Sequence, residues 1–377
     1  MHTTPRLTPV SAPATPKHDI SQGSTRKLSL KDLAALKRIG LVLGRPASGP
    51  GHDVMGDPCI VWDDDIGSWR MFVFSAPPGH GHAVCRGGDP GKWEFLGPLT
   101  FTNPDDVIEP SSYPTHKPYV VIDAHHPNRA AKIGGRFCLL SVSMRAKHKV
   151  VQRAWASHLA GPWTWDRGPY IDLGAANDQD ARHVDAVTAI HFPERDETLI
   201  YYMGYPETAQ NHPLSPFGSA QMLAISRGAG PAQKRGVLLP PSDIAGHWAS
   251  GWVGGLQILP GVEHRWIAIA NASPTAPRRG DNAAHAEEPP PSLPGIAVTD
   301  AEFPDRGWRW LPQPLEWISD IPADALANGE GVNLWRQHLL ALPDGRWGLY
   351  YNSGRYGTEQ MYAQMGLAGP GLLRKPR

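Results

Sequence analysis

The stretch Asp57-Pro58-Cys59-Ile60-Val61-Trp62 decides the fold of this chain, because the same order of elements returns four more times behind it. A short apolar run bounded by turn residues is typical of a buried β-strand. The turn Asp63–Gly67 follows, and after it comes the aromatic-rich strand Trp69–Phe74. A third strand over His82–Cys85 and a closing segment over Gly91–Glu94 complete this first unit.

Four further units repeat this order of strands with heavy variation. Their first strands are predicted over Lys117–Val121, Val184–Thr188, Gly255–Leu259 and Arg336–Leu342. Gly and Pro number 40 and 39, which suits many short strands joined by turns. Repeated units of three or four strands predict the blades of a propeller. We therefore predict an all-β, five-bladed β-propeller domain over residues 46–377, with an irregular all-β domain as the alternative.

Residues 1–45 are predicted to form an N-terminal arm with one short helix. The first 27 or so are rich in Thr, Pro, Ser and Ala, as in flexible arms. Ser29–Asp32 fits a capping box. Leu33, Leu36 and Ile39 then form an apolar stripe that predicts a helix.

Composition and charge argue against several classes of partner. Lys+Arg and Asp+Glu are both 36, and a net charge of zero favours neither nucleic acid nor an anionic membrane surface. No segment approaches the roughly 18 to 20 apolar residues of a membrane span. The N-terminus lacks the apolar region of a secretory signal, so we expect a cytoplasmic protein. Three cysteines in no metal-binding spacing argue against a disulfide framework.

The starts of the innermost strands meet at the axis of a propeller, although they are far apart in sequence. Three carboxyl groups fall near such starts in the first, third and fifth units, at Asp57, Asp185 and Glu330. Hydrolysis of a glycosidic bond uses carboxyl groups gathered at one site: one acts as the acid and another acts as the base or nucleophile. We predict these three as catalytic residues. A turn or cap role is the alternative for each, since Asp before Pro often initiates a turn.

Other polar and aromatic side chains near the same starts are predicted to bind substrate. Trp252 and Trp335 are predicted to stack on sugar rings. The remaining predicted substrate-binding residues are His116, Lys117, His183, Asn333, Arg336 and His338.

No metal cofactor is predicted, although the chain has 17 histidines. The pairs His80/His82 and His125/His126 lack the three or four converging ligands that a zinc site needs. A structural Ca²⁺ or Na⁺ ion in the central channel is left open by the sequence.

The chain resembles the five-bladed β-propeller glycoside hydrolases, a group that contains arabinanases, β-xylosidases, levansucrase-like enzymes and anhydrogalactosidases. The resemblance rests on Gly56-Asp57-Pro58 ahead of an apolar strand, on His183–Ala186 and on Gly161-Pro162-Trp163, and it covers about residues 50–367. It implies that Asp57 is the general base or the nucleophile. It also implies that Asp185 orients the substrate and adjusts the pKa of the acid.

The resemblance leaves the general acid open. Many members carry it as a Glu followed by Gly-Pro, whereas Gly251–Gly255 in the fourth unit has no carboxylate. Glu330, between two glycines, is the nearest candidate, and His338 or His116 is the alternative.

The function predicted from these residues is a glycosidase that acts on a glycoside or oligosaccharide. One alternative is a glycoside phosphorylase, for which Lys117, Arg336 and Arg355 are the available cations. A non-catalytic carbohydrate-binding propeller is the other alternative, and it predicts axial carboxylates that diverge or pair with cations. The sugar, the linkage and the oligomeric state are not specified by the sequence.

Overall fold

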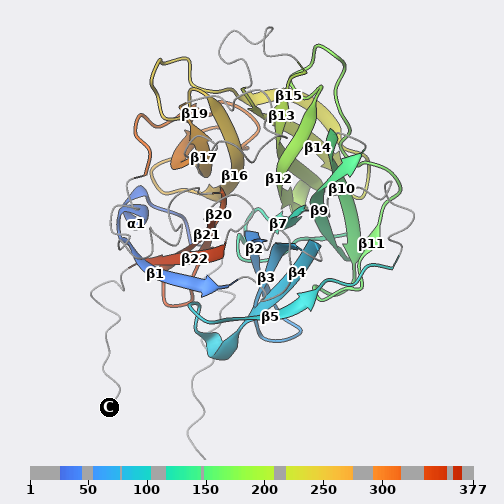
Figure 1. Cartoon of the computed structure of the whole chain (residues 1–377), viewed down its shortest axis with the longest axis vertical. Coiled ribbons are helices and arrows are strands. Elements are labelled where there is room, and N and C mark those ends of the chain that lie inside the picture. Colours follow the sequence, from blue (N-terminus) through green and yellow to red (C-terminus); the bar gives the residue numbers. More distant parts are fainter. Residues whose placement is uncertain are drawn as a thin grey trace, which may run out of the picture.

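Five antiparallel sheets arranged in a ring make up the computed structural model of the protein (Figure 1). The predicted all-β five-bladed propeller is therefore confirmed. No helix in the described part of the chain is long and apolar enough to cross a membrane. The structure describes residues 26–44, 54–76, 79–102, 116–145, 148–207, 218–274, 292–315, 335–354 and 360–366.

Blades 1 to 4 are each built from four main strands that follow one another in the chain, running in order from the axis outward. Blade 1 contains β2 (Val54–Asp63), β3 (Ser68–Ala76), β4 (Gly79–Cys85) and β5 (Trp93–Pro98). Blade 2 contains β6 (His116–Val120), β9 (Arg136–Arg145), β10 (His148–Ala156) and β11 (Thr164–Trp165), with β8 (Lys132–Ile133) beside β9. Blade 3 contains β12 (His183–Phe192), β13 (Glu197–Tyr205), β14 (Ala220–Arg227) and β15 (Gln233–Leu239), with β7 (Ile122–Asp123) parallel to β12. Blade 4 contains β16 (Trp252–Pro260), β17 (Trp266–Ser273), β18 (Leu293–Thr299) and β19 (Arg309–Trp310).

Blade 5 closes the ring by joining two distant parts of the chain. Its three inner strands are β20 (Trp335–Ala341), β21 (Trp347–Ser353) and β22 (Gln360–Gly366). The outermost strand is β1 (Leu36–Leu43), which pairs antiparallel with β22. In Figure 1 the blue β1 accordingly lies beside the red β22. The predicted boundary at residue 45 thus falls after a strand that belongs to the propeller.

The helix predicted through Ile39 is wrong in its extent. Helix α1 spans only Leu30–Ala34 and begins at the predicted capping box, in which Ser29 and Asp32 exchange hydrogen bonds with the backbone. In β1, Leu36 and Gly40 are buried while Ile39 is 49% exposed. Leu36 faces the core through strand pairing with β22, so the stripe that suggested a helix is divided between two elements.

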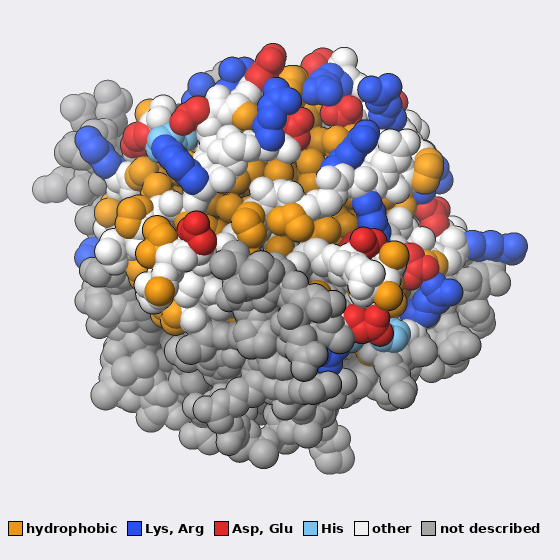
Figure 2. Space-filling view, turned by 90° about the horizontal axis from the view of Figure 1, so that it is seen from above, with side chains coloured by type: hydrophobic (Ala, Val, Ile, Leu, Met, Phe, Trp, Pro, Cys, Tyr) orange, Lys and Arg blue, Asp and Glu red, His pale blue; other side chains and the backbone are white. Residues whose placement is uncertain are grey.

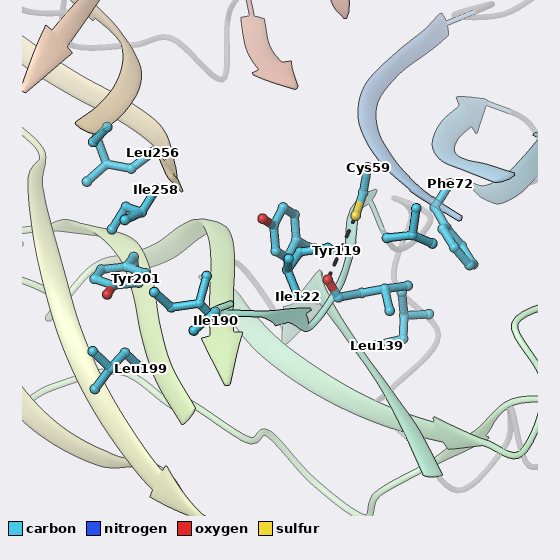
Figure 3. Packing of buried hydrophobic residues seen from close by; sticks show 14 of the residues in the cluster. Cys59, Phe72, Tyr119, Ile122, Leu139, Ile190, Leu199, Tyr201, Leu256 and Ile258 are labelled. Carbon is cyan, nitrogen blue, oxygen red and sulfur yellow. Dashed lines mark hydrogen bonds between the residues drawn. The ribbon is translucent and has the colours of Figure 1, made fainter. Parts of the chain in front are cut away.

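Apolar side chains from neighbouring blades meet close to the innermost strands. Figure 3 shows Cys59 of β2, Tyr119 of β6, Ile190 of β12 and Leu256 of β16 as parts of one buried cluster. The Cys59 thiol also donates to the Val120 carbonyl, with an S···O distance of 3.8 Å. Burial of apolar surface, worth about 25 cal/mol per Å², holds the blades against one another in this region.

Side-chain amides complete the attachment between blades. Gln257 donates to the Leu339 carbonyl at 2.9 Å and accepts from the Leu339 N–H at 2.5 Å. Asn352 Oδ1 accepts from the Asp57 N–H at 3.2 Å and so links blade 5 to blade 1. An innermost strand is a sheet edge whose backbone groups need partners when buried. These amides supply such partners and help fix the positions of the innermost strands.

Candidate functional site

Each innermost strand carries an extra residue near its start, and these bulges place the axial side chains. The strand pairing shifts by one residue after Gly56, His116, Asp185, Val253 and Trp335. Asp57, Lys117 and Ala186 follow three of these shifts and have left-handed φ angles of 53°, 56° and 44°. A left-handed conformation costs a non-glycine residue about 1–3 kcal/mol, and residues in such conformations cluster at functional sites. A bulge also turns a side chain away from the regular direction of its strand.

The register defines more closely how the two carboxyls near the strand starts are placed. Asp185 pairs with Met203 immediately before the shift, as Gly56 does with Phe74. Asp185 therefore corresponds to Gly56, one residue earlier than Asp57. Pro58 has no backbone N–H to donate, so it interrupts the hydrogen bonds of the strand after Asp57. No proline follows Asp185 at the corresponding bulge.

Asp57 is a buried carboxyl, 6% exposed. Burial raises its pKa, and this effect is larger than the lowering by the positive charges of Lys117 and Arg336. Among the described residues, no hydrogen bond reaches its carboxyl oxygens. A buried carboxyl with a raised pKa beside cations is a candidate for proton transfer.

Asp185 is equally buried but is held by two lysines. Its Oδ1 lies 2.5 Å from Lys117 Nζ and its Oδ2 lies 2.7 Å from Lys149 Nζ. The Ala186 N–H donates to Oδ1 at 2.7 Å. The Asp185 side chain is 3% exposed, whereas those of Lys117 and Lys149 are 21% and 31% exposed. Both lysine side chains are therefore partly exposed, while the carboxylate that pairs with them is buried.

Lys149 is a residue of the site that sequence reasoning missed. It lies on β10, the third strand of blade 2, while Asp185 lies on the innermost strand of blade 3. Only the packing of two neighbouring blades brings them together, so no spacing in the sequence predicts the contact.

Arg336 reaches from blade 5 to the bulges of blades 2 and 3. Its guanidinium donates to the Lys117 carbonyl at 3.0 Å and to the Val187 carbonyl. It also lies 5.0 Å from the ring centre of Tyr119. The residue is 4% exposed, so these contacts favour a tie between three blades over the predicted contact with substrate. Its predicted substrate role stays a prediction.

Two predicted histidines lie in surroundings that keep them neutral. Burial, Lys149 and Arg182 lower the pKa of His183 to about 4, and its Nδ1 accepts from the Lys149 N–H at 3.2 Å. His338 is fully buried, its Nε2 accepts from the Ile60 N–H at 3.4 Å, and burial lowers its pKa to about 3. Neither ring therefore carries the extra proton of an imidazolium acid at neutral pH.

The other predicted site residues are described in part or not at all. Trp252 is 4% exposed and packs with Ala186, Met203 and Tyr205, so its ring faces are largely covered by protein. The strands β6 and β20 begin at His116 and Trp335, but the structure does not describe these two side chains. Glu330, Asn333 and Arg355 lie outside the described residues. The roles of all these residues stay predictions.

The histidine pairs considered for a metal site have other partners. His82 Nδ1 lies 2.7 Å from the Arg70 guanidinium, and His125 pairs with Glu194 at 2.9 Å. Within the described ranges, no three His, Cys, Asp or Glu side chains are grouped so that they could hold a metal ion.

Comparison with solved structures identifies the fold group. A structure described as a glycoside hydrolase matches with a TM-score of 0.63 and 12% identity, covering 93% of this chain and 99% of its own. A glycoside hydrolase structure from Parabacteroides distasonis matches with a TM-score of 0.55 and 13% identity, covering 92% and 98%. A structure from the GH130 family, described as mannoside phosphorylases that include glycoside hydrolases targeting β-1,2 mannosidic linkages in Candida mannan, matches with a TM-score of 0.52 and 13% identity, covering 89% and 99%.

The chain therefore has the fold of the five-bladed β-propeller glycoside hydrolases. At 12–13% identity the likeness is one of fold. No protein-family model and no curated protein sequence matches the chain.

Proposed function

We propose that this protein is a glycosidase whose reaction takes place at the axial end of the innermost strands, with Asp57 as the group that accepts a proton from water or attacks the sugar. The observation that carries the proposal is the state of Asp57. It is buried, its pKa is raised, and its backbone is held in a left-handed conformation at a bulge. A raised pKa makes a carboxylate a stronger proton acceptor, which suits a general base.

The neighbouring positive charges suggest different roles for the two axial carboxyl groups, Asp57 and Asp185. Lys117 stabilises the ionised form of Asp57 and at the same time pairs with Asp185. Asp185 is committed to Lys117 and Lys149, so we assign it to fixing these lysines and not to proton transfer. The reaction still requires a general acid, for which His116 is the alternative left open by the sequence. Glu330 is our candidate for it on the sequence alone.

A substrate screen tests the proposal. The protein is assayed against aryl glycosides and against plant and algal oligosaccharides, and each active substrate is repeated with Asp57→Asn. We expect hydrolysis without added phosphate, and loss of that hydrolysis in Asp57→Asn. Turnover that persists in a folded Asp57→Asn protein would contradict the assignment, and binding without turnover would favour a carbohydrate-binding propeller.

Phosphorolysis is a second candidate because three cations surround the Asp57 carboxyl. Lys117, Arg336 and Lys149 all act on its pKa by their positive charge. Against this, Arg336 is engaged by two carbonyls and both lysines by Asp185. Assaying each active substrate with and without inorganic phosphate, and looking for a sugar phosphate product, separates the two reactions.

A further inference from the structure

The bulge at Asp57 is held by a contact between blades 1 and 5. Its two residues, Asp57 and Pro58, stand opposite one residue of β3 and provide a single backbone N–H, because proline has none. The Asn352 side chain of β21 accepts that N–H through Oδ1 at 3.2 Å. Asp57 and Asn352 are 6% and 3% exposed, so the contact lies inside the protein. The side of the ring that bears β15 and β19, by contrast, shows a mixture of acidic and basic side chains around apolar ones (Figure 2).

Gly56 makes room for the Asn352 side chain. A Cβ atom on Gly56 would lie 2.7 Å from Asn352 Nδ2 and 2.8 Å from Asn352 Cγ, closer than real Cβ contacts come. The φ angle of Gly56 lies outside the left-handed region, so its backbone conformation does not itself require glycine. The missing side chain at position 56 therefore serves the contact with Asn352.

The start of the Asn352 side chain is fixed by the sheet of blade 5. Asn352 pairs with Trp335 of β20 on one side and with Met361 of β22 on the other. A side chain on a central strand is placed more precisely than one on a loop. Asn352 thus brings its amide to the Asp57 bulge from a rigid part of the neighbouring blade.

The other two left-handed positions have support of the same kind. Arg336 donates to the Lys117 carbonyl at 3.0 Å, and Asp185 accepts from the Ala186 N–H at 2.7 Å. A left-handed conformation of a non-glycine residue persists only where its surroundings fix it. Each of the three left-handed residues therefore has one backbone group bound by a side chain, and at Asp57 that side chain belongs to Asn352.

From this geometry we propose that Asn352 is a positioning residue for the reaction: it keeps Asp57 in the left-handed conformation from which its carboxyl acts on the substrate, and Gly56 is required because it admits the amide. This rests on the proposed glycosidase function. Without Asn352 the Asp57 N–H is buried with no acceptor, which is unfavourable, so the bulge should relax until the N–H finds another partner. A displacement of the carboxyl by about 1 Å is enough to slow a reaction up to about 10²-fold.

Matched asparagine variants test this role. Asn352→Ala removes the acceptor for Asp57. Asn128→Ala is the control, because Asn128 is 4% exposed and its Oδ1 also accepts from a backbone N–H of blade 5, that of Ala341, at 3.2 Å. Ala341 ends β20, whereas Asn352 pairs with the residue that begins it, so the control lies at the opposite end of the strand. Gly56→Ala is made alone and together with Asn352→Ala.

We expect kcat to fall about tenfold or more in Asn352→Ala while KM changes less than about threefold. Asn128→Ala should lose stability in the same way but keep kcat near the parent value. Gly56→Ala should slow the reaction as Asn352→Ala does, and the double variant should be no slower than Asn352→Ala, because losses through one contact do not add. If Gly56→Ala does not fold, the two asparagine variants decide the matter.

A second readout needs no turnover. Burial raises the pKa of Asp57, so a relaxed bulge that exposes the carboxyl should bring its NMR titration midpoint down in Asn352→Ala and leave it in place in Asn128→Ala. An unchanged midpoint in Asn352→Ala would overturn the role, as would a kcat equal to that of Asn128→Ala or additive losses in the double variant. A failure of Asp57 as the reactive group appears instead as turnover that persists in Asp57→Asn, so the two failures are distinguishable.

Discussion

Asp57 of blade 1 and Asp185 of blade 3 are both buried carboxyls at the start of an innermost strand, yet their surroundings differ. Asp57 is 6% exposed, its pKa is raised by burial, and no described residue donates a hydrogen bond to its carboxyl. Asp185 is 2% exposed and accepts from two ammonium groups and a backbone N–H. Burial alone therefore does not set the state of such a carboxyl, because its partners differ between the two positions.

The one-residue offset between the two positions explains this difference. Asp57 follows the register shift and adopts φ of 53°, whereas Asp185 precedes the shift and remains paired in the ladder. Asp185 consequently meets its lysines across the boundary with blade 2. In the third blade the left-handed position is occupied by Ala186, which has no functional group to offer.

The largest expected effect comes from removing the Asp57 carboxylate. Asp57→Asn should lower kcat about 10³-fold or more, because the amide neither accepts a proton nor attacks the sugar. Its thermal midpoint should hold or rise, since folding raises the pKa of Asp57 and the ionised carboxyl therefore disfavours the folded state at neutral pH. Steady-state kinetics and calorimetry check both parts, and a fall of the midpoint by several degrees would contradict the second.

Asp185→Asn, unlike Asp57→Asn, should lower the stability of the fold. Loss of this carboxylate leaves Lys117 and Lys149 facing each other without a buried counter-ion. We expect the free energy of unfolding to fall by about 1–3 kcal/mol, a value kept low because both lysines are partly solvated. Urea denaturation measures it, with Asp180→Asn as the matched control for a buried Asp paired to a lysine. A stability equal to that of the parent would remove the structural role assigned to Asp185.

Arg336→Lys should loosen the bulges of blades 2 and 3 together, because Arg336 contacts both. Lysine keeps the positive charge but does not span the Lys117 and Val187 carbonyls as the guanidinium does. We expect a loss of about 1–2 kcal/mol in stability and a fall in kcat of about tenfold, with a smaller change in KM. If stability falls while kcat stays at the parent value, Arg336 ties the blades but does not position the site.

Lys117→Met should produce the smallest and most specific change. Lys117 is the strongest of the positive charges that lower the pKa of Asp57, so its removal should raise that pKa further. A base must be ionised to act, and activity is lost as the pH falls through its pKa. The acidic limb of the kcat/KM profile should therefore move to higher pH in Lys117→Met and stay in place in Lys234→Met, since Lys234 pairs with the buried Asp180 at 2.8 Å.

The sequence predicted those features that depend on local patterns. Five apolar runs with turn residues around them indicated the innermost strands. Each of these strands is buried on both faces, so its continuous apolar sequence identifies it without knowledge of the strand with which it pairs. The absence of a carboxylate from Gly251–Gly255 is likewise plain in the sequence, and Gly254 there approaches Asn271 too closely to carry a side chain.

Features that depend on contacts between blades escaped prediction. The strand β1 (Leu36–Leu43) pairs with β22, which lies more than 300 residues later in the chain. No nearby segment of the sequence therefore indicated that Leu36–Leu43 belongs to a sheet. The contact between Lys149 and Asp185 likewise arises only when β10 and β12 pack side by side. The burial of Arg336 and His338 also follows from neighbouring blades.

The most direct test of the central claim is the titration of the Asp57 carboxyl, followed by NMR of protein with ¹³C-labelled Asp and assigned with Asp57→Asn. The account predicts a midpoint above the ordinary 3.8 of an Asp side chain, and a further rise in Lys117→Met. A midpoint at or below 3.8 would contradict it, because Asp57 would then be a stabilised carboxylate like any paired surface Asp, and the distinction between blade 1 and blade 3 would disappear.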